Sequence, residues 1–309
     1  MKSFAGTFAF AVLAMIGAVE PGFATTMFPQ KFKCPIGGER FEDYVIGSST
    51  SWGSRPDGRS YGTLPIYPVV ECPKNGFILY DEDIPESDLR ILKPLVEGAE
   101  YQALRTSETP HYRVWWLLKA VAKGEPELVG ALLQASWETD DDASRKSRYQ
   151  EAFVAAVRAL PGGDGLGNRW LVFRLRAANA LRELGRFEEA ATLLNEAAKP
   201  AFLPTDADER SGTEQFVGGL RRLIAEHNRF AEPTSLIPPR EALQRCEGAV
   251  GALSPAESEA CRGPAIEAAR NEMREWEAQR TATDDASANQ AAEAAEEATR
   301  STRKAKRGN

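Results

Sequence analysis

The pattern of apolar and polar positions divides the chain into a β-type part, a helical part and a polar end. Residues 28–85 are dense in Pro and Gly, and their β-type runs are short, at 43–46, 66–71 and 77–80. Over residues 86–232 apolar residues recur at helical spacing, and shorter helical stretches follow over 239–280. The pattern therefore predicts a mainly α protein, with antiparallel helical hairpins behind a small β-rich N-terminal module.

The polar end covers residues 281–309. It contains Ala, Glu, Thr and Arg but no bulky apolar residue, so it has nothing with which to form a core. We expect a disordered, solvated tail. Its last part, 300–307, is basic, and the alternative is a tail that touches an anionic surface.

The clearest helical hairpin spans residues 174–198. Ala178, Leu181 and Leu184 share one helical face, and Gly185 is placed to end the first helix. The second helix carries its own apolar stripe, which consists of Phe187, Ala190, Leu193, Leu194 and Ala197. We expect the Phe187 ring to be buried between the two helices.

This hairpin resembles one unit of a tetratricopeptide repeat, which is roughly 34 residues long. The matching positions follow the family's order of small, large and aromatic residues: Ala178, Leu181, Gly185, Phe187, Ala190, Leu194 and Ala197. Arg174 and Ala177 depart from it, since the family usually has Trp and Leu there. The alternative is an ordinary two-helix packing. The resemblance implies a scaffold that binds partners and does no chemistry.

Other helices are expected on both sides of this hairpin. Ser87 is a candidate cap for a helix over 87–105 that Pro94 weakens, and Gly124 separates two helices at 110–122 and 125–137. Further helices are expected at 143–160, 213–228, 240–250 and 255–261, and from Pro264 onward. Ser254 and Glu257 form a capping-box pattern. The loop at 48–61 is expected to be a surface connection.

Two segments of the N-terminal module are alike. Cys34-Pro35-Ile36-Gly37-Gly38 and Cys72-Pro73-Lys74-Asn75-Gly76 look like zinc knuckles of the form Cys-Pro-x-Cys-Gly, with Gly37 and Asn75 in place of the second cysteines. A knuckle pair followed by repeat-type helices resembles a bacterial protein family. That resemblance implies a knuckle fold and gives no information about an activity. Of the family's metal ligands, only Cys34 and Cys72 are present.

The remaining knuckle cysteines, Cys34 and Cys72, are predicted to form a disulfide, because paired knuckles bring their first cysteines to one centre. Two free thiols, or a metal site completed by other ligands, are the alternatives. A second disulfide is predicted between Cys246 and Cys261, which lie on two short helices joined by a turn. We expect neither a metal nor another cofactor.

Residues 1–24 resemble a secretory signal peptide. Lys2 precedes an uncharged run over 4–19, and Gly22-Phe23-Ala24 fits the cleavage pattern. The alternative is an uncleaved anchor, but the run is shorter than the roughly 20 residues of a membrane span. We expect a periplasmic or secreted protein with no stable membrane anchor after cleavage.

Charge and residue motifs exclude several classes of function. The net charge of −7 disfavours a nucleic-acid binder. The glycine-rich turn at 162–167 lacks the ending of a phosphate loop, and the acidic runs at 140–142 and 206–209 lack calcium-loop spacing. The two histidines, His111 and His227, lie in no catalytic motif.

The sequence is therefore interpreted as an exported, non-catalytic scaffold that binds a protein or peptide. Aromatic anchors dominate such interfaces, so four tryptophans are the candidate partner-binding residues: Trp115, Trp116, Trp137 and Trp170. The alternative function is a cell-envelope hydrolase whose active site is built from scattered carboxylates. A deep pocket with converging titratable groups would favour the hydrolase.

Overall fold

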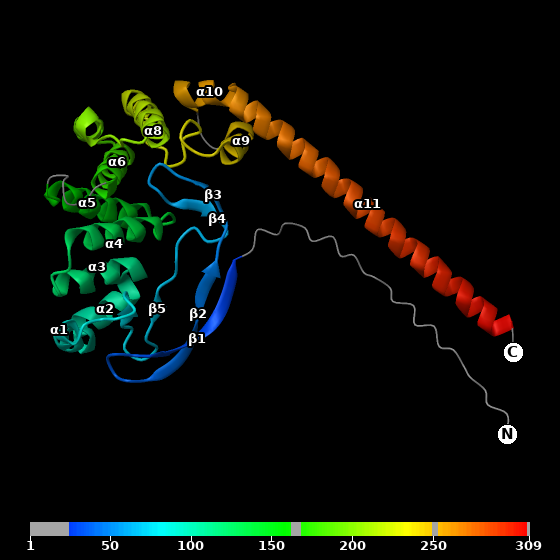
Figure 1. Cartoon of the computed structure of the whole chain (residues 1–309), viewed down its shortest axis with the longest axis horizontal. Helices are drawn as coiled ribbons and strands as arrows, with labels where there is room; N and C mark the ends of the chain where they lie inside the picture. Colours follow the sequence, from blue (N-terminus) through cyan, green and yellow to red (C-terminus); the bar gives the residue numbers. More distant parts are fainter. Residues whose placement is uncertain (1–24, 162–167, 249–252, 308–309) are drawn as a thin grey trace.

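The computed structural model describes residues 25–161, 168–248 and 253–307. The predicted signal peptide and the glycine-rich turn lie outside these residues. The described chain is mainly α, with small antiparallel β-hairpins at the N-terminus, as predicted. Figure 1 shows a stack of helices with the N-terminal strands along one side and a long C-terminal helix that extends away from it.

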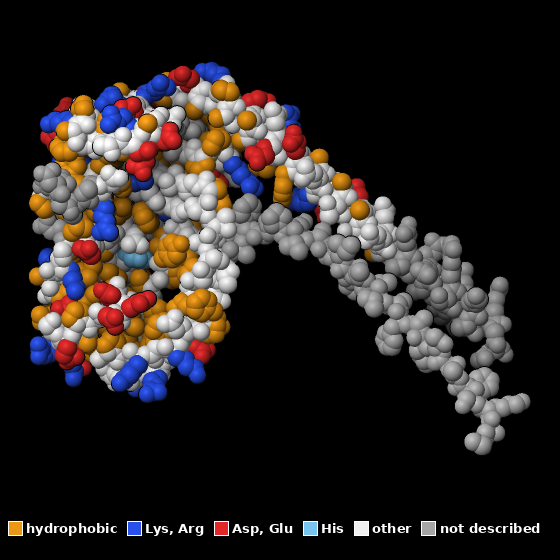
Figure 2. All heavy atoms as spheres, in the orientation of Figure 1, with side chains coloured by type: hydrophobic (Ala, Val, Ile, Leu, Met, Phe, Trp, Pro, Cys, Tyr) orange, Lys and Arg blue, Asp and Glu red, His pale blue; other side chains and the backbone are white. Residues whose placement is uncertain are grey.

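The strands form three antiparallel pairs. β1 (Thr26–Lys33) pairs with β2 (Arg40–Ser48), so that Phe32 lies opposite Phe41. β3 (Ser51–Ser54) pairs with β4 (Ser60–Gly62), and β5 (Val70–Glu71) pairs with β6 (Ile78–Leu79). Figure 2 shows hydrophobic side chains on the surface where the β1–β2 ribbon lies. Met27, Phe28 and Tyr44 of this ribbon are exposed.

The helical stack consists of antiparallel neighbours joined by short connections. Its members are α1 (Glu86–Glu97), α2 (Ala99–Ser107), α3 (Pro110–Ala120), α4 (Glu125–Trp137), α5 (Ala143–Ala159), α6 (Asn168–Glu183), α7 (Phe187–Ala197) and α8 (Ala207–Ala225). Gly185 has a φ of +80°, and this left-handed conformation ends α6 as the sequence predicts. A short 3-10 turn, η2 (Pro200–Phe202), precedes α8.

The expected helix over 87–105 is two helices, and the break is at Gly98. Pro94 lies inside α1, where it removes a single backbone hydrogen bond without ending the helix. Gly98 has an extended backbone, and its N–H donates to the carbonyl of Leu95. The residue before α1 is Pro85, so Ser87 does not cap this helix.

Two hydrophobic cores lie along the stack. One joins α4 to α8, with Leu132, Phe153 and Leu181 at its centre. The other is shared between the N-terminal module and α1 to α3, and it includes the buried disulfide sulfurs beside Phe77 and Leu92. The small β-hairpins therefore rest on the helices for their apolar contacts, as expected for a Pro- and Gly-rich segment of this size.

The C-terminal part contains α9 (Pro239–Glu247), α10 (Pro255–Cys261) and α11 (Pro264–Arg307). The prediction of a disordered tail differs from the structure here, because α11 continues through residues 281–307. Its sequence is rich in Ala, Glu and Arg and contains neither Pro nor Gly after Pro264, which favours a helix even without packing. Residues 274–292 are all exposed, and Figure 2 shows charged side chains beside scattered apolar ones there.

Among the described residues, none of the helices combines the length and the apolar content that a membrane crossing requires.

Candidate binding groove and the polar clusters around it

The two disulfides predicted from the sequence are present. Cys34 and Cys72 are joined at 2.09 Å, and the turns that carry them have matching backbone bonds. Gly38 N donates to the carbonyl of Cys34, and Gly76 N donates to that of Cys72. Asn75 ties the two turns together, since its side chain donates to Ile36 O at 2.7 Å. The second bond, between Cys246 and Cys261, measures 1.98 Å.

A third metal-type ligand lies beside the first disulfide. The Glu39 carboxylate and the sulfurs of Cys34 and Cys72 lie within 4.8 Å of one another. In the disulfide the sulfurs are not thiolates, so this group offers a cation one carboxylate alone. The residues that could hold a metal therefore act here as a structural cross-link, with all four cysteines of the chain oxidised.

The expected surface loop at 48–61 contains buried charges, which corrects that expectation. Arg55 and Asp57 lie at the tip of the β3–β4 hairpin, and both are buried. They bond each other at 2.6 Å, and Arg55 also bonds Asp140, which follows α4, at 2.7 Å. Lys146 of α5 contacts the same Asp140 carboxylate at 2.6 Å. The hairpin tip is thus fixed to the helical stack by ion pairs.

These ion pairs determine the protonation states of their members. Burial opposes the charge of Arg55, but Asp57 and Asp140 outweigh it and raise the pKa of the guanidinium. Burial also opposes the charge of Asp140, and the hydrogen bonds from Arg55 and Lys146 overcome it and lower the pKa of Asp140. Each charge is therefore held in its ionised form by the other.

Arg182 and Glu183 form a second buried group at the end of α6. Arg182 donates to the carbonyls of Asn228 and Phe230 at 2.7 and 2.8 Å, which fixes the segment after α8. Glu183 accepts hydrogen bonds from Asn179 and Gln150. Burial and the charge of Asp57 raise the pKa of Glu183. This group, like the previous one, connects segments that are distant in sequence.

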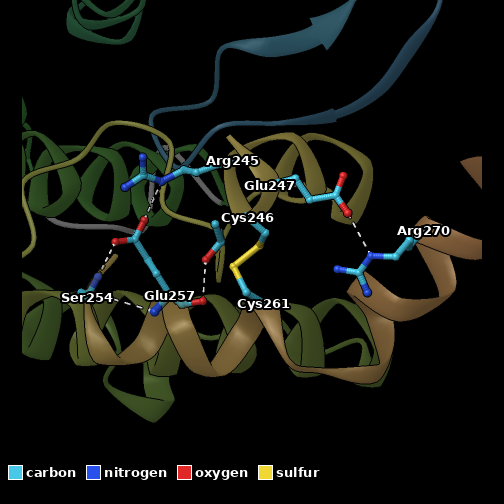
Figure 3. The surroundings of a disulfide bond; sticks show 8 residues. Arg245, Cys246, Glu247, Ser254, Glu257, Cys261 and Arg270 are labelled. Atoms are coloured by element: carbon cyan, nitrogen blue, oxygen red, sulfur yellow. Dashed lines mark hydrogen bonds and ion pairs between the residues drawn. A yellow bond between two sulfur atoms is a disulfide. The ribbon is translucent and has the colours of Figure 1, made fainter. Parts of the chain in front are cut away.

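The Cys246–Cys261 bond lies beside a third polar cluster, which Figure 3 shows in detail. Ser254 and Glu257 form the predicted capping box at the start of α10. The buried Glu257 carboxylate also accepts from Arg245 of α9 at 2.8 Å and from Asn228 at 2.8 Å. The disulfide and the carboxylate together hold α9 against α10.

The histidines and the tryptophans do not converge on one site. His111 is buried and its Nδ1 lies 2.7 Å from Glu138, whereas the exposed His227 stacks on Phe187. Trp170 is only 5% exposed and packs on Phe202, so it belongs to the core. The other three are half-buried and lie against core clusters: Trp115, Trp116 and Trp137.

A groove with a volume of about 410 Å³ lies between α6 and α8. Its apolar lining comes from Leu171, Val172 and Leu175 of α6 and from Phe216 of α8. Val172 is 45% exposed, so apolar surface is accessible there. The volume lies within the range of small-ligand and peptide side-chain pockets.

Arg176 lies at one end of this groove. Its Nη1 donates to the carbonyl oxygens of Arg55 and Pro56, and its Cζ lies 5.6 Å from the centre of the Phe216 ring. Gly58 has a φ of +94°, and a side chain there would meet Arg176 Nε. In the described part of the chain, no carboxylate oxygen lies within 4.0 Å of an Arg176 nitrogen, so this guanidinium forms no ion pair there. Burial lowers the pKa of Arg176, and the charge of Asp57 offsets this in part.

Sequence reasoning did not identify Arg176 or the buried charges around it. A signal was available in α6, where Arg176, Asn179 and Glu183 recur three and four residues apart. They share one helical face on an otherwise apolar hairpin, which indicates a polar contact on that face.

Comparisons with protein-family models, with curated proteins and with solved structures find no match for this chain.

Proposed function

We propose that the chain is an exported, non-catalytic scaffold that binds a protein or peptide through a tetratricopeptide-like body. The observation that carries this proposal is the apolar groove between α6 and α8, whose accessible side chains include Val172. Accessible apolar surface in a concave site favours association with a partner.

The packing around Gly185 supports the repeat-like part of the proposal. α6 and α7 form an antiparallel hairpin, and α8 packs against both of them. Ala178 and Ala190 are fully buried where the two helices approach each other. A following repeat would place its first helix beside α6 in this way.

The alternative function, a hydrolase, receives less support from the same geometry. Asp57 and Asp140 are bound by Arg55, and Glu257 by Arg245. These carboxylates connect structural elements, whereas a catalytic pair would face a cavity that admits substrate. Among the residues that the structure describes, one carboxylate lines the groove, that of the exposed Glu209.

The two disulfides support export, because such bonds persist in oxidising compartments. N-terminal sequencing of the protein from its own cells tests this part of the proposal. We expect the mature chain to begin at or near Thr25. An intact Met1 in the soluble fraction would contradict export.

Affinity capture of partners, followed by quantitative mass spectrometry, tests the scaffold. The bait proteins are the mature chain, the groove variant Val172→Glu, and the control Ile91→Glu. Ile91 is 47% exposed, much like Val172, but it lies on α1 away from the groove. We expect a protein that the wild type and the Ile91 variant retain and the Val172 variant loses. Equal capture by all three would contradict a function for this groove.

A further inference from the structure

The groove between α6 and α8 combines an apolar lining with a cation, Arg176, that has no carboxylate partner among residues 25–161, 168–248 and 253–307. A guanidinium removed from water is stable when an anion accompanies it, and two other buried arginines of this chain follow that rule. Arg55 pairs with Asp57 and Asp140, and Arg113 pairs with Glu71 at 2.7 Å. Arg176 instead bonds two backbone carbonyls through Nη1.

The remaining donors of Arg176 make no hydrogen bond to the described residues. Its side chain lines the groove, and Nη2 has no hydrogen-bond partner among the described residues. The loop at Arg55 and Gly58 supports the guanidinium from one side, and the Phe216 ring lies on another. A guanidinium fixed in this way is prepared to bind a carboxylate with little loss of side-chain freedom.

The charge of the groove is not uniform, and this restricts where an anion can bind. Glu209 lies seven residues before Phe216 on α8, which corresponds to about 10 Å along the helix. The Glu209 end therefore repels an anion, while the Arg176 end attracts one. The apolar side chains of Leu171, Val172 and Leu175 come from the same helix as Arg176.

We propose that this groove binds a peptide segment in which an acidic side chain, paired with Arg176, is flanked by apolar side chains that cover Leu171, Val172 and Phe216. The inference rests on the scaffold function proposed above and specifies the chemistry of its partner. It requires no group beyond those that line the groove.

Fluorescence polarisation with a labelled peptide library tests the inference. The library holds randomised apolar segments in matched pairs that differ at one central position, Glu or Gln. We expect members with Glu to bind the mature chain about tenfold more tightly than their Gln counterparts, as charge-assisted hydrogen bonds to arginine do. The difference should vanish in Arg176→Gln and persist in Arg176→Lys.

Arg176 also bonds the loop at Arg55 and Pro56, so a substitution there could act through that loop. A second variant therefore changes the groove without changing Arg176. Val172→Gln adds no carboxylate that could pair with Arg176 one helical turn away, but it places a polar group on the apolar lining, so all peptides should lose affinity. Ile91→Gln should bind like the wild type. Circular dichroism and thermal unfolding of each variant establish that it is folded.

Three outcomes would overturn the inference. Equal affinity for Glu and Gln members would remove the role of Arg176. The site would be assigned to another carboxylate source by either of two results. One is a preference for a free peptide C-terminus over its amide, with no preference for Glu; the other is binding of decanoate but of no peptide. Absence of any peptide binding would reject this ligand class, whereas the scaffold function is judged separately by affinity capture.

Discussion

Buried charged side chains connect the distant segments of this protein. Arg55, Arg182 and Glu257 are all buried, and each contacts a residue far away in sequence or on another element. Such groups destabilise a fold when they are unpaired and contribute to one specific arrangement when they are fully hydrogen-bonded. The contacts that hold distant segments together therefore include buried polar side chains as well as apolar ones.

Glu257→Gln tests the best-connected of these groups. Glu257 is 1% exposed, and the substitution removes the charge that faces Arg245. We expect the free energy of unfolding to fall by about 2 to 3 kcal/mol, as measured by denaturant titration at pH 7. The matched control is Glu259→Gln, because Glu259 is 71% exposed and its pair with Arg222 should contribute less than about 1 kcal/mol.

The same variant has a defined dependence on pH. Burial raises the pKa of Glu257, but the hydrogen bonds from Arg245 and Ser254 outweigh it, so the pKa lies below its usual value. A lowered pKa stabilises the folded state above the unfolded value of about 4.3, and this contribution is lost as the pH falls through the folded value. The deficit of Glu257→Gln should therefore shrink below about pH 4. A constant deficit down to pH 2 would contradict this assignment.

Phe187→Ala tests the hairpin at Gly185. Contrary to the expectation of full burial, the ring is half-buried and stacks on the exposed His227 at 4.5 Å. We expect a loss of about 2 kcal/mol in thermal or chemical unfolding, less than for a fully buried Phe. His227→Asn removes the stacking partner and tolerates the positive φ at this position, so it should cost less than about 1 kcal/mol. An unchanged melting temperature for Phe187→Ala would mean that the ring contributes nothing to the hairpin.

At the scale of elements, the sequence predicted local structure better than contacts between elements. Gly185, the capping box at Ser254 and both disulfides were predicted because each depends on a few residues with specific chemistry. The contact between Arg55 and Asp140 was not predicted, because 85 residues separate them and the sequence of a polar loop indicates a solvent-exposed segment. The position of the Glu39 carboxylate beside the Cys34 sulfur was not predicted either, because it depends on how the hairpin folds.

The Cys246–Cys261 bond stabilises the small C-terminal core, which has only Ala242, Leu243, Ile266 and Ala269 as its buried members in the described chain. Replacing both cysteines with Ser should destabilise α9 and α10 by about 3 kcal/mol, given the separation of 15 residues. Hydrogen exchange resolves the effect by segment. We expect faster exchange in α9 and α10 with little change in α4 to α7. Uniform acceleration over the whole chain would contradict local stabilisation.

At the scale of the whole molecule, packing is unevenly distributed. α1 to α8 share two large cores, while α11 contacts the rest of the protein through its first turns and then extends away (Figure 1). Ile266 and Ala269 are buried, whereas residues 274–292 are exposed. Stability should therefore depend strongly on where the chain is truncated.

Two truncations make this dependence measurable. Deleting residues 281–309 removes a segment in which residues 281–292 are all exposed. The melting temperature followed by tryptophan fluorescence should therefore change by less than about 1 °C, while far-ultraviolet circular dichroism loses helical signal. Deleting residues 264–309 also removes Ile266 and Ala269 from the C-terminal core. We expect the melting temperature to drop by several degrees, since a loss of about 1 kcal/mol lowers it by roughly 2 to 4 °C in a protein of this size. A large drop for the shorter deletion would mean that the outer part of α11 packs in solution, and size-exclusion chromatography would then establish whether it packs against a second copy.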